Sequence, residues 1–369
     1  MTIAISGTSG ITQTGSFDSS STFGFKNRII NSAMVIDQRN AGASTTPTGS
    51  TYTLDRFRVL ATQSSKFSVQ QNAGAVTPPT GFTNYLGITS LSAYSVTTGD
   101  NFSIQQKIEG YNVADFSYGT ASASTTTLSF WVRSSLTGTF GGVFGNEAAN
   151  RCYVFSYTIN AANTWEQKTI TVIGDTAGTW VTNNGNGLDI RFNFGSGSDK
   201  LAAAGSWGST FYNSVTGQTS VVGTLNATFY ITGVQLEKGS TATSFDYRPY
   251  GTELVLCQRY YCKEQANAIG NLLATGFCDA TTTTTNYFLF PVTMRTNPTA
   301  LEQSGTAGDY SVFNAAGSSI VCSAVPTFSS ATTKAARFVA TVASGLTGGN
   351  ATMVRAASTN AYLGFSAEL

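Results

Sequence analysis

Hydrophobic and polar residues alternate along several short segments of this chain, a pattern typical of half-buried β-strands. In 188–194 (LDIRFNF) every second residue is apolar, and in 127–133 (TLSFWVR) Leu128, Phe130 and Val132 fall on one face. The same reading predicts further strands at 30–36, 51–60, 66–71, 91–96, 152–159, 168–173 and 227–236. Short strands separated by turns of Gly, Ser and Asn indicate an all-β sandwich.

One segment departs from the strand pattern. In 252–264 (TELVLCQRYYCKE), Leu254, Cys257 and Tyr261 recur at helical spacing, and Thr252 can cap the start. The spacing predicts a short linking helix, assigned to 251–265. Beyond it, strand patterns at 286–294, 318–325, 337–343 and 361–365 predict a second, smaller β domain, with 280–285 (ATTTTT) as a solvated loop or edge.

These elements divide the chain into a segment 1–26, a first β domain 27–250, the linking helix 251–265 and a C-terminal β domain 266–369. Residues 1–26 are mostly small and polar, with isolated apolar residues such as Ile3, Ile11 and Phe17. Such a segment buries too little alone to stay folded, but it suits an extended strand added to a partner. We therefore predict that 1–26 attaches the chain to another protein.

Charge and composition exclude several functions. The 369 residues include 20 Lys plus Arg against 19 Asp plus Glu, so the net charge is only +1 and offers no basic field for nucleic acid. There is no histidine, which excludes Ser-His-Asp and Cys-His catalysis and His-ligated metals. The five cysteines show no CxxC spacing and are predicted to be buried thiols of a protein made in a reducing compartment.

Targeting signals are absent from the sequence pattern. The start, MTIAISGTSG, has no basic region and no sustained apolar region of a signal peptide. No apolar stretch approaches the roughly 18–20 residues of a membrane helix. We therefore expect synthesis in a cytoplasm and no membrane insertion.

Several segments, taken in chain order, resemble a recurring family of bacteriophage tail-fibre and related virion proteins. They are 27–39 (NRIINSAMVIDQR), 52–57 (YTLDRF), 108–121 (IEGYNVADFSYGTA), 128–135 (LSFWVRSS), 158–180, 233–261 and 290–299 (FPVTMRTNPT). The resemblance implies a jelly-roll domain similar to carbohydrate-binding modules, then a small β-sandwich, assembled as a homotrimer in the virion. It implies host adsorption or particle decoration, and it transfers no catalytic residues. Residues 1–26 lie outside the resemblance, so their contact with other virion proteins is predicted from the spaced apolar residues of the segment itself.

Glycan recognition requires flat aromatic faces beside directional polar groups. The best candidate is 205–213 (GSWGSTFYN), which carries Trp207, Phe211 and Tyr212, and a second is Tyr118 in 111–118. Asp189 is the candidate acceptor for sugar hydroxyls. The alternative for each aromatic is packing in the core or at a subunit contact.

Two further kinds of site are considered from the acidic residues and the Asn-Gly segments, a pair of catalytic carboxylates and a structural calcium site. A glycosidase needs two carboxyls about 5–9.5 Å apart, and Asp115, Asp175 and Asp189 remain open as a spatial cluster. Asp37, Asp55 and Asp246 lie near arginines and favour local ion pairs or turn contacts. The stretch 183–189 (NNGNGLD) could hold a structural calcium but favours an Asn-Gly turn, so no cofactor is predicted.

Three functions follow from these observations. The first is a non-enzymatic, trimeric tail fibre or spike that binds host surface polysaccharide through weak, multivalent sites. The second is a decoration or connector protein of the tail or capsid whose surfaces are all protein contacts. The third is a polysaccharide depolymerase that uses two carboxylates.

Overall fold

The computed structural model describes residues 3–6, 10–13 and 25–369. The predicted attachment segment 1–26 therefore lies largely outside the described residues. Its described part is an antiparallel hairpin in which β1 (Ile3–Ser6) pairs with β2 (Gly10–Gln13).

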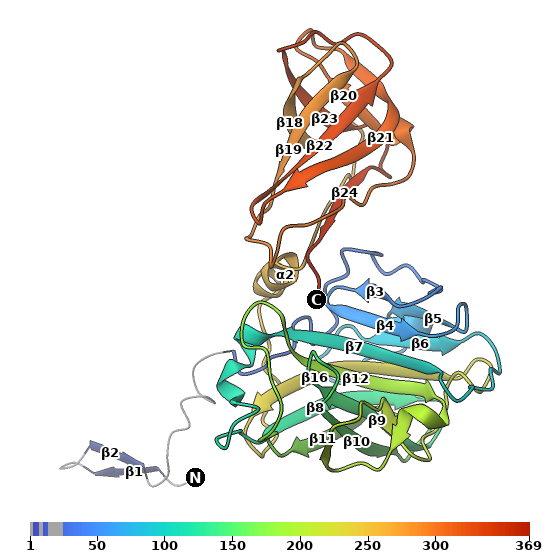
Figure 1. The fold of residues 1–369 in the computed structure, drawn as a ribbon, viewed down its shortest axis with the longest axis vertical. Coiled ribbons are helices and arrows are strands. Elements are labelled where there is room, and N and C mark those ends of the chain that lie inside the picture. The colour runs from blue at the N-terminus through green and yellow to red at the C-terminus, as the bar shows by residue number, and fades with distance from the viewer. Residues whose placement is uncertain (1–2, 7–9, 14–24) are drawn as a thin grey trace.

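Two antiparallel sheets, formed by strands between residues 51 and 238, pack face to face (Figure 1). The larger sheet has seven strands in the order β14 (Trp207–Gly208), β10 (Cys152–Ile159), β9 (Gly138–Gly145), β12 (Asn186–Ser196), β7 (Asn101–Glu109), β4 (Phe57–Ala61) and β3 (Thr51–Leu54). The smaller has five, in the order β11 (Glu166–Val172), β8 (Thr126–Ser134), β16 (Thr228–Lys238), β6 (Leu86–Ser90) and β5 (Phe67–Gln71). The chain passes repeatedly between the sheets, as in a jelly roll, and the predicted all-β sandwich is confirmed.

The alternating segments fill the space between these sheets. Leu128, Phe130 and Val132 of β8 and Phe192 of β12 are buried, and the ring centres of Phe130 and Phe192 lie 5.0 Å apart. Because side chains alternate along a strand, the opposite residues of β12 project from the outer face of the larger sheet. Short elements outside the two sheets are the parallel pair β13 (Leu201–Ala202) and β15 (Ser214–Val215) and the 3-10 turns η1 (Ala73–Ala75), η2 (Gly110–Asn112), η3 (Ala114–Phe116) and η4 (Ser198–Lys200).

The predicted strand at 30–36 is wrong. Residues 30–34 form turns, because Asn31 and Met34 both have φ of 59°, which interrupts an extended chain. The Asn31 side chain holds this bend: its amide donates to the carbonyls of Ile36 (2.8 Å) and Asp55 (2.9 Å), and its oxygen accepts from the Ile36 N–H. The apolar residues here reach the core without a strand.

Two other predicted strands also differ from the structure. The segment 51–60 forms the hairpin β3–β4, in which Leu54 pairs with Phe57 and Arg56 has φ of 67° at the turn. The segment 91–96 is irregular, and the neighbouring strand is β6. Conversely, the central strands β7 and β9 were not predicted, because β7 (NFSIQQKIE) is rich in polar residues and half of β9 (GTFGGVFG) is glycine.

The predicted linking helix is correct only in its first part. Helix α2 (Tyr250–Gln258) contains the buried Cys257, but the chain then becomes extended as β17 (Tyr261–Gln265), so helix at 259–265 is wrong. β17 pairs with β24 (Tyr362–Ser366) close to the C-terminus. Backbone hydrogen bonds to this distant strand override the local helical spacing of Tyr261.

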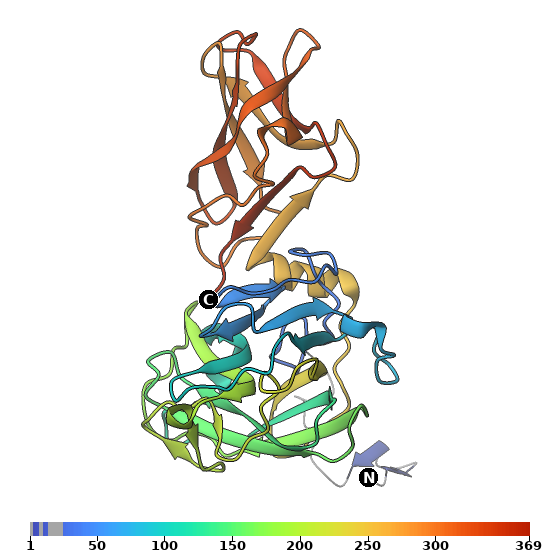
Figure 2. The same cartoon turned by 90° about the vertical axis from the view of Figure 1, so that its right-hand side faces the viewer.

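Six strands of the second β domain close into a barrel, where the resemblance implied a small β-sandwich for residues 266–369. Their order is β18 (Leu272–Cys278), β19 (Thr283–Leu289), β22 (Ala335–Val342), β21 (Ser319–Ala331), β20 (Tyr310–Phe313) and β23 (Ala351–Ala356), with the turn η5 (Ala307–Asp309) before β20. Of the predicted loop 280–285, residues 283–285 belong to β19, and Thr284 and Thr285 are buried. The smaller domain therefore closes its sheet, which leaves the β17–β24 ribbon between barrel and sandwich (Figure 2).

A buried ionic network around Glu368 joins the two units. The chain end that carries Glu368 lies near α2 (Figure 1). The side chain of Arg56 is only 1% exposed and pairs with Glu368, which is 4% exposed. The Arg56 guanidinium also lies 3.6 Å from the ring centre of Tyr260, and Arg39 lies 3.6 Å from that of Tyr261. Charges from the sandwich thus meet aromatic rings and a carboxylate from the C-terminal half.

Candidate functional site

The outer face of the seven-stranded sheet carries polar side chains from adjacent strands. The register places Arg191 of β12 opposite Gln105 of β7. Arg191 donates to Oδ2 of Asp189 at 3.0 Å (Nε) and 2.5 Å (Nη2), and Gln105 Nε2 donates to the same oxygen at 2.7 Å. Oδ1 of Asp189 and Oε1 of Gln105 are buried without a hydrogen-bond partner among the described residues. The face therefore presents a cation next to two unused acceptors.

An aromatic ring lies beside this polar group. Residues 197–220 fold over β9 and β10, and they place Phe211 on Gly145 of β9. A Cβ at Gly145 would stand 2.2 Å from Cε2 of Phe211, so only glycine leaves room for this ring. The Arg191 guanidinium lies 4.5 Å from the Phe211 ring centre, and its Nη1 donates to Oδ1 of Asn213 at 2.8 Å. Phe211 and Arg191 thus fix each other in place.

Tyr212 belongs to the small apolar cluster beneath this loop. It is half-buried against the cluster of Val143, Cys152, Val154 and Val215. Its backbone N–H lies 3.4 Å from Sγ of Cys152, and burial raises the pKa of the Cys152 thiol to about 11. Of the predicted residues, the structure brings Asp189, Phe211 and Tyr212 to the outer side of the larger sheet.

Tyr118 and Trp207 lie in a different group, on the core side of the same sheet. Their ring centres are 5.8 Å apart, and Trp180 packs edge-on against both at 5.0 and 5.4 Å. The Tyr118 hydroxyl lies 2.7 Å from Oγ1 of Thr126, and the Trp207 indole donates to the Ile173 carbonyl at 2.7 Å. These rings and their polar atoms are thus engaged in contacts within the protein. Glycan binding by Tyr118 and Trp207 remains a prediction that the structure does not test.

Sequence reasoning missed four residues of the outer face, one of which is Arg191 of β12. Gln105 and Lys107 project from β7, and Arg58 projects from β4 opposite Gln105. The signal was present in 101–109, where Ser103, Gln105 and Lys107 alternate with the buried Phe102 and Ile104. The position of Arg58 beside them depends on the sheet order and has no local signal.

The three carboxylates left open as a catalytic cluster have separate cationic partners. Asp115 pairs with Arg28 at 2.9 Å, Asp175 with Arg151 at 2.6 Å, and Asp189 with Arg191.

Of the acids near arginines, Asp37 makes a turn contact, whereas Asp55 and Asp246 accept from residues more distant in the sequence. Asp37 accepts from the backbone of Asn40 and Gly42, and Asp55 accepts from Gln38. Asp246 accepts from the backbone N–H of Asn27 at 3.2 Å.

In the candidate calcium segment 183–189, residues 183–185 form a bend that leads into β12. The side-chain oxygen of Asn183 accepts from the Gly185 N–H at 2.9 Å, while Asp189 is engaged by Arg191. In the part of the chain that the structure describes, no three His, Cys, Asp or Glu side chains gather into a group that could hold a metal ion. Within the same residues, no helix has the length and apolarity to cross a membrane.

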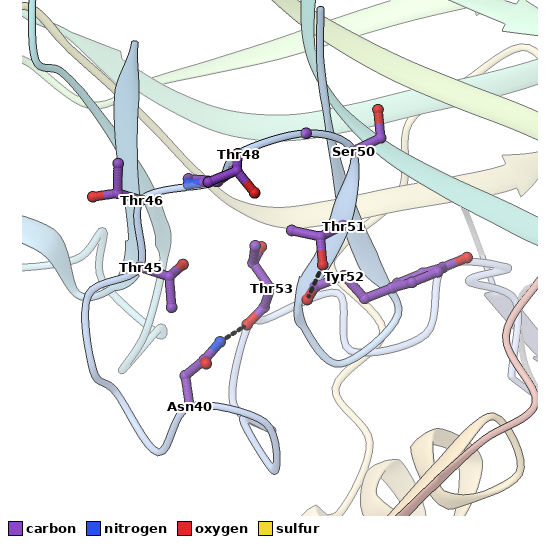
Figure 3. A pocket seen from close by; sticks show the side chains of 10 residues that line it. Asn40, Thr45, Thr46, Thr48, Ser50, Thr51, Tyr52 and Thr53 are labelled. Atoms are coloured by element: carbon purple, nitrogen blue, oxygen red, sulfur yellow. Dashed lines mark hydrogen bonds between the residues drawn. The ribbon is translucent and has the colours of Figure 1, made fainter. Parts of the chain in front are cut away.

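A polar hollow of about 360 Å³ lies at the free edge of the larger sheet (Figure 3). Its lining is dominated by hydroxyl side chains of 45–53, together with Asn40, whose amide donates to the Thr53 carbonyl. Tyr52 also borders the hollow, but its ring extends away from the threonines, and its hydroxyl donates to the Leu369 carbonyl at 2.7 Å. The hollow is uncharged and has no free aromatic plane, so it is weaker as a binding site than the face around Arg191.

Comparison with known proteins gives partial likenesses only. No family model and no curated protein matches the chain. Solved structures that match include the enzymatically active domain of tailspike protein 4 from bacteriophage CBA120 (13% identity, TM-score 0.30, 58% of this chain). Another is TmCBM61 in complex with β-1,4-galactotriose (9% identity, TM-score 0.31, 58% of this chain). A third is a family 11 carbohydrate-binding module from Clostridium thermocellum in complex with a mixed-linked tetrasaccharide (13% identity, TM-score 0.27, 55% of this chain).

This chain is similar to these proteins over little more than half its length. The match spans 22% of the tailspike chain but the whole of the two carbohydrate-binding modules. TM-scores near 0.3 assign no function.

Proposed function

We propose that this protein is a non-enzymatic glycan-binding component of a bacteriophage virion, a tail fibre or spike that attaches to host surface polysaccharide. The observation that carries the glycan-binding part is the outer face of the seven-stranded sheet. There Asp189, Arg191 and Gln105 lie beside the half-buried ring of Phe211. A sugar presents a C–H face that packs on such a ring and hydroxyls that bond such polar groups.

Binding of the purified chain to a glycan array tests this part. We expect binding above background, weakened about fivefold or more by Phe211→Ala, since a central contact residue contributes at least about 1 kcal/mol. Phe328→Ala is the matched control, because Phe328 is a half-buried ring of the barrel. Background signal across the array, or equal binding by both variants, would contradict the proposed site.

The virion location and the trimer rest on the motif resemblance and on the physics of multivalent attachment. Three linked copies raise the effective concentration of a weak site without any new contact. Sedimentation of the purified chain is expected to give a trimer, and immunogold labelling of intact particles is expected to place it on the tail. Unchanged host adsorption by particles that lack the protein would argue against the receptor role.

Absence of catalysis is part of the proposal, since the three candidate carboxylates each pair with a different arginine. Incubation with host capsule is therefore expected to release no new reducing ends. Their appearance would restore the depolymerase alternative.

A decoration or connector role is the second candidate, and the barrel surface favours it. Leu272, Tyr287 and Leu289 are 50%, 44% and 75% exposed around a hollow of about 410 Å³ between β17, β18 and β19. Exposed apolar groups of this kind suit contacts between proteins. Labelling on the capsid, with unchanged adsorption after deletion, would support this role.

A further inference from the structure

Three basic side chains share the outer face of the larger sheet. They come from the adjacent strands β4, β7 and β12 (Figure 1). Arg58 and Arg191 stand opposite Gln105 from its two sides, and Lys107 stands opposite Asp189. The two-residue period of a strand directs all of these side chains to one face. The cations are therefore neighbours although their positions span 134 residues.

Among the residues that the structure describes, two of the three cations have no carboxylate partner. Arg191 is neutralised by Asp189 at 2.5 Å. Arg58 and Lys107 are half-buried, and neither forms an ion pair with any residue that the structure describes. The buried Arg56, by contrast, is paired with Glu368 at the junction of the two units. The face thus has an excess of about two positive charges.

The electrostatic environment of Lys107 reflects this excess. Burial lowers its pKa, and Arg58 and Arg191 lower it further, against the opposing effects of Asp189 and Glu147. Partial removal from water disfavours a charged ammonium group unless an anion compensates it. A bound anion would supply that compensation to Lys107 and Arg58 together.

The same face also offers unused acceptors. Oε1 of Gln105 and Oδ1 of Asp189 have no donor, and their side chains are nine-tenths or more buried. Buried acceptors without partners are uncommon, and they are satisfied by donors such as hydroxyls. Phe211 borders the face on the β9 side, and Tyr52, opposite Arg58, borders it on the other. The ligand that satisfies these groups combines negative charge, hydroxyl donors and an apolar ring face.

We propose that this face binds an anionic glycan, with the acidic substituent held by Arg58 and Lys107 and the ring hydroxyls directed to Gln105 and Asp189. This inference rests on the proposed glycan-binding function and adds the class of sugar. A carboxylate of a uronic acid and a phosphate substituent offer the same chemistry to these two cations.

Calorimetric titration with matched probes tests the inference. One pair is tetragalacturonate and its methyl ester, which keeps the sugar rings but loses the charge. The other is phosphorylated dextran and plain dextran. We expect at least one charged probe to bind about tenfold or more tightly than its neutral counterpart, as the loss of charged hydrogen bonds implies. The preferred pair identifies carboxylate or phosphate.

Substitutions then locate the binding. Arg58→Gln and Lys107→Gln are each expected to weaken the charged probe about tenfold and to leave the neutral probes unchanged. Lys334→Gln, an exposed cation of the barrel, is the matched control, and melting curves verify that all variants fold. Equal affinity for charged and neutral probes, or unchanged affinity in both face variants, overturns this inference while glycan binding stands. Failure to bind any glycan on the array overturns both.

Discussion

Neutralising Glu368 should strongly destabilise the protein. Arg56 and Glu368 are 1% and 4% exposed, so Glu368→Gln leaves a buried guanidinium without its counter-charge. Removing one partner of a buried pair costs about 3–5 kcal/mol. At about 2–4 °C per kcal/mol for a unit of 150–250 residues, the melting temperature should fall by about 6–20 °C. Differential scanning calorimetry measures this change directly.

Two comparisons separate this effect from a general loss of charge. Asp115→Asn removes a carboxylate that is 46% exposed and should cost about 1 kcal/mol or less. The double variant Arg56→Met with Glu368→Leu removes both charges and should regain most of the lost stability, because neither group is left unpaired. On the scale of about 2–4 °C per kcal/mol, a difference in melting temperature of about 2 °C corresponds to about 1 kcal/mol or less. The reasoning would be refuted if the Glu368→Gln and Asp115→Asn proteins melted within about 2 °C of each other.

Three further predictions follow from local structure. Burial raises the pKa of Asp55 to about 7, so its stabilisation is complete below about pH 4 and is lost as pH rises through 7. The free energy of unfolding in urea should therefore be higher at pH 5 than at pH 8, and Asp55→Asn should reduce that difference. Gly145→Ala should displace Phe211, cost about 1–3 kcal/mol and weaken glycan binding, whereas Gly208→Ala, which has open space, should change neither melting nor binding. All five thiols are free and buried, so Ellman's reagent should react slowly with native protein and fully in guanidinium, and rapid native labelling of Cys152 would contradict its burial.

The sequence pattern predicted elements well where one face of a strand is apolar. The strand at 152–159 was predicted with the bounds that β10 has, and Leu128, Phe130 and Val132 of β8 are all buried as expected. Alternation of apolar and polar residues does not predict a strand when both of its faces are covered, or when pairing with neighbouring strands stabilises it. β7 and β9 are of this kind, since their pairing with β12 compensates for polar residues in one and glycine in the other.

Left-handed residues and long-range pairing account for the other errors. Asn31 is of a residue type that tolerates positive φ, but nothing local marks Met34 as a positive-φ position. Tyr261 fits a helical stripe, but its pairing with Ser366 is decided by a strand about a hundred residues away. Local propensity is a weak prior against such tertiary contacts.

The candidate site was predicted in part, for the same reason. Asp189 and Phe211 could be identified by residue type, because an acceptor in a strand and aromatics in a glycine-flanked loop are local features. That they meet at Arg191, and that Arg58 and Lys107 stand next to them, depends on the order of β4, β7, β12 and β9 in the sheet. No single segment contains that information.

The scarcity of charge makes its placement informative. Only 11% of the residues are charged, and some of the buried ones join distant parts of the chain, as Arg56 joins Glu368 and Glu109 joins Arg259. A surface that needed charge only for solubility would expose its cations to water. Arg58 and Lys107 are instead half-buried, adjacent and unpaired among the described residues, which neither solubility nor folding requires. Binding of an external anion gives a physical reason for keeping both cations on this face.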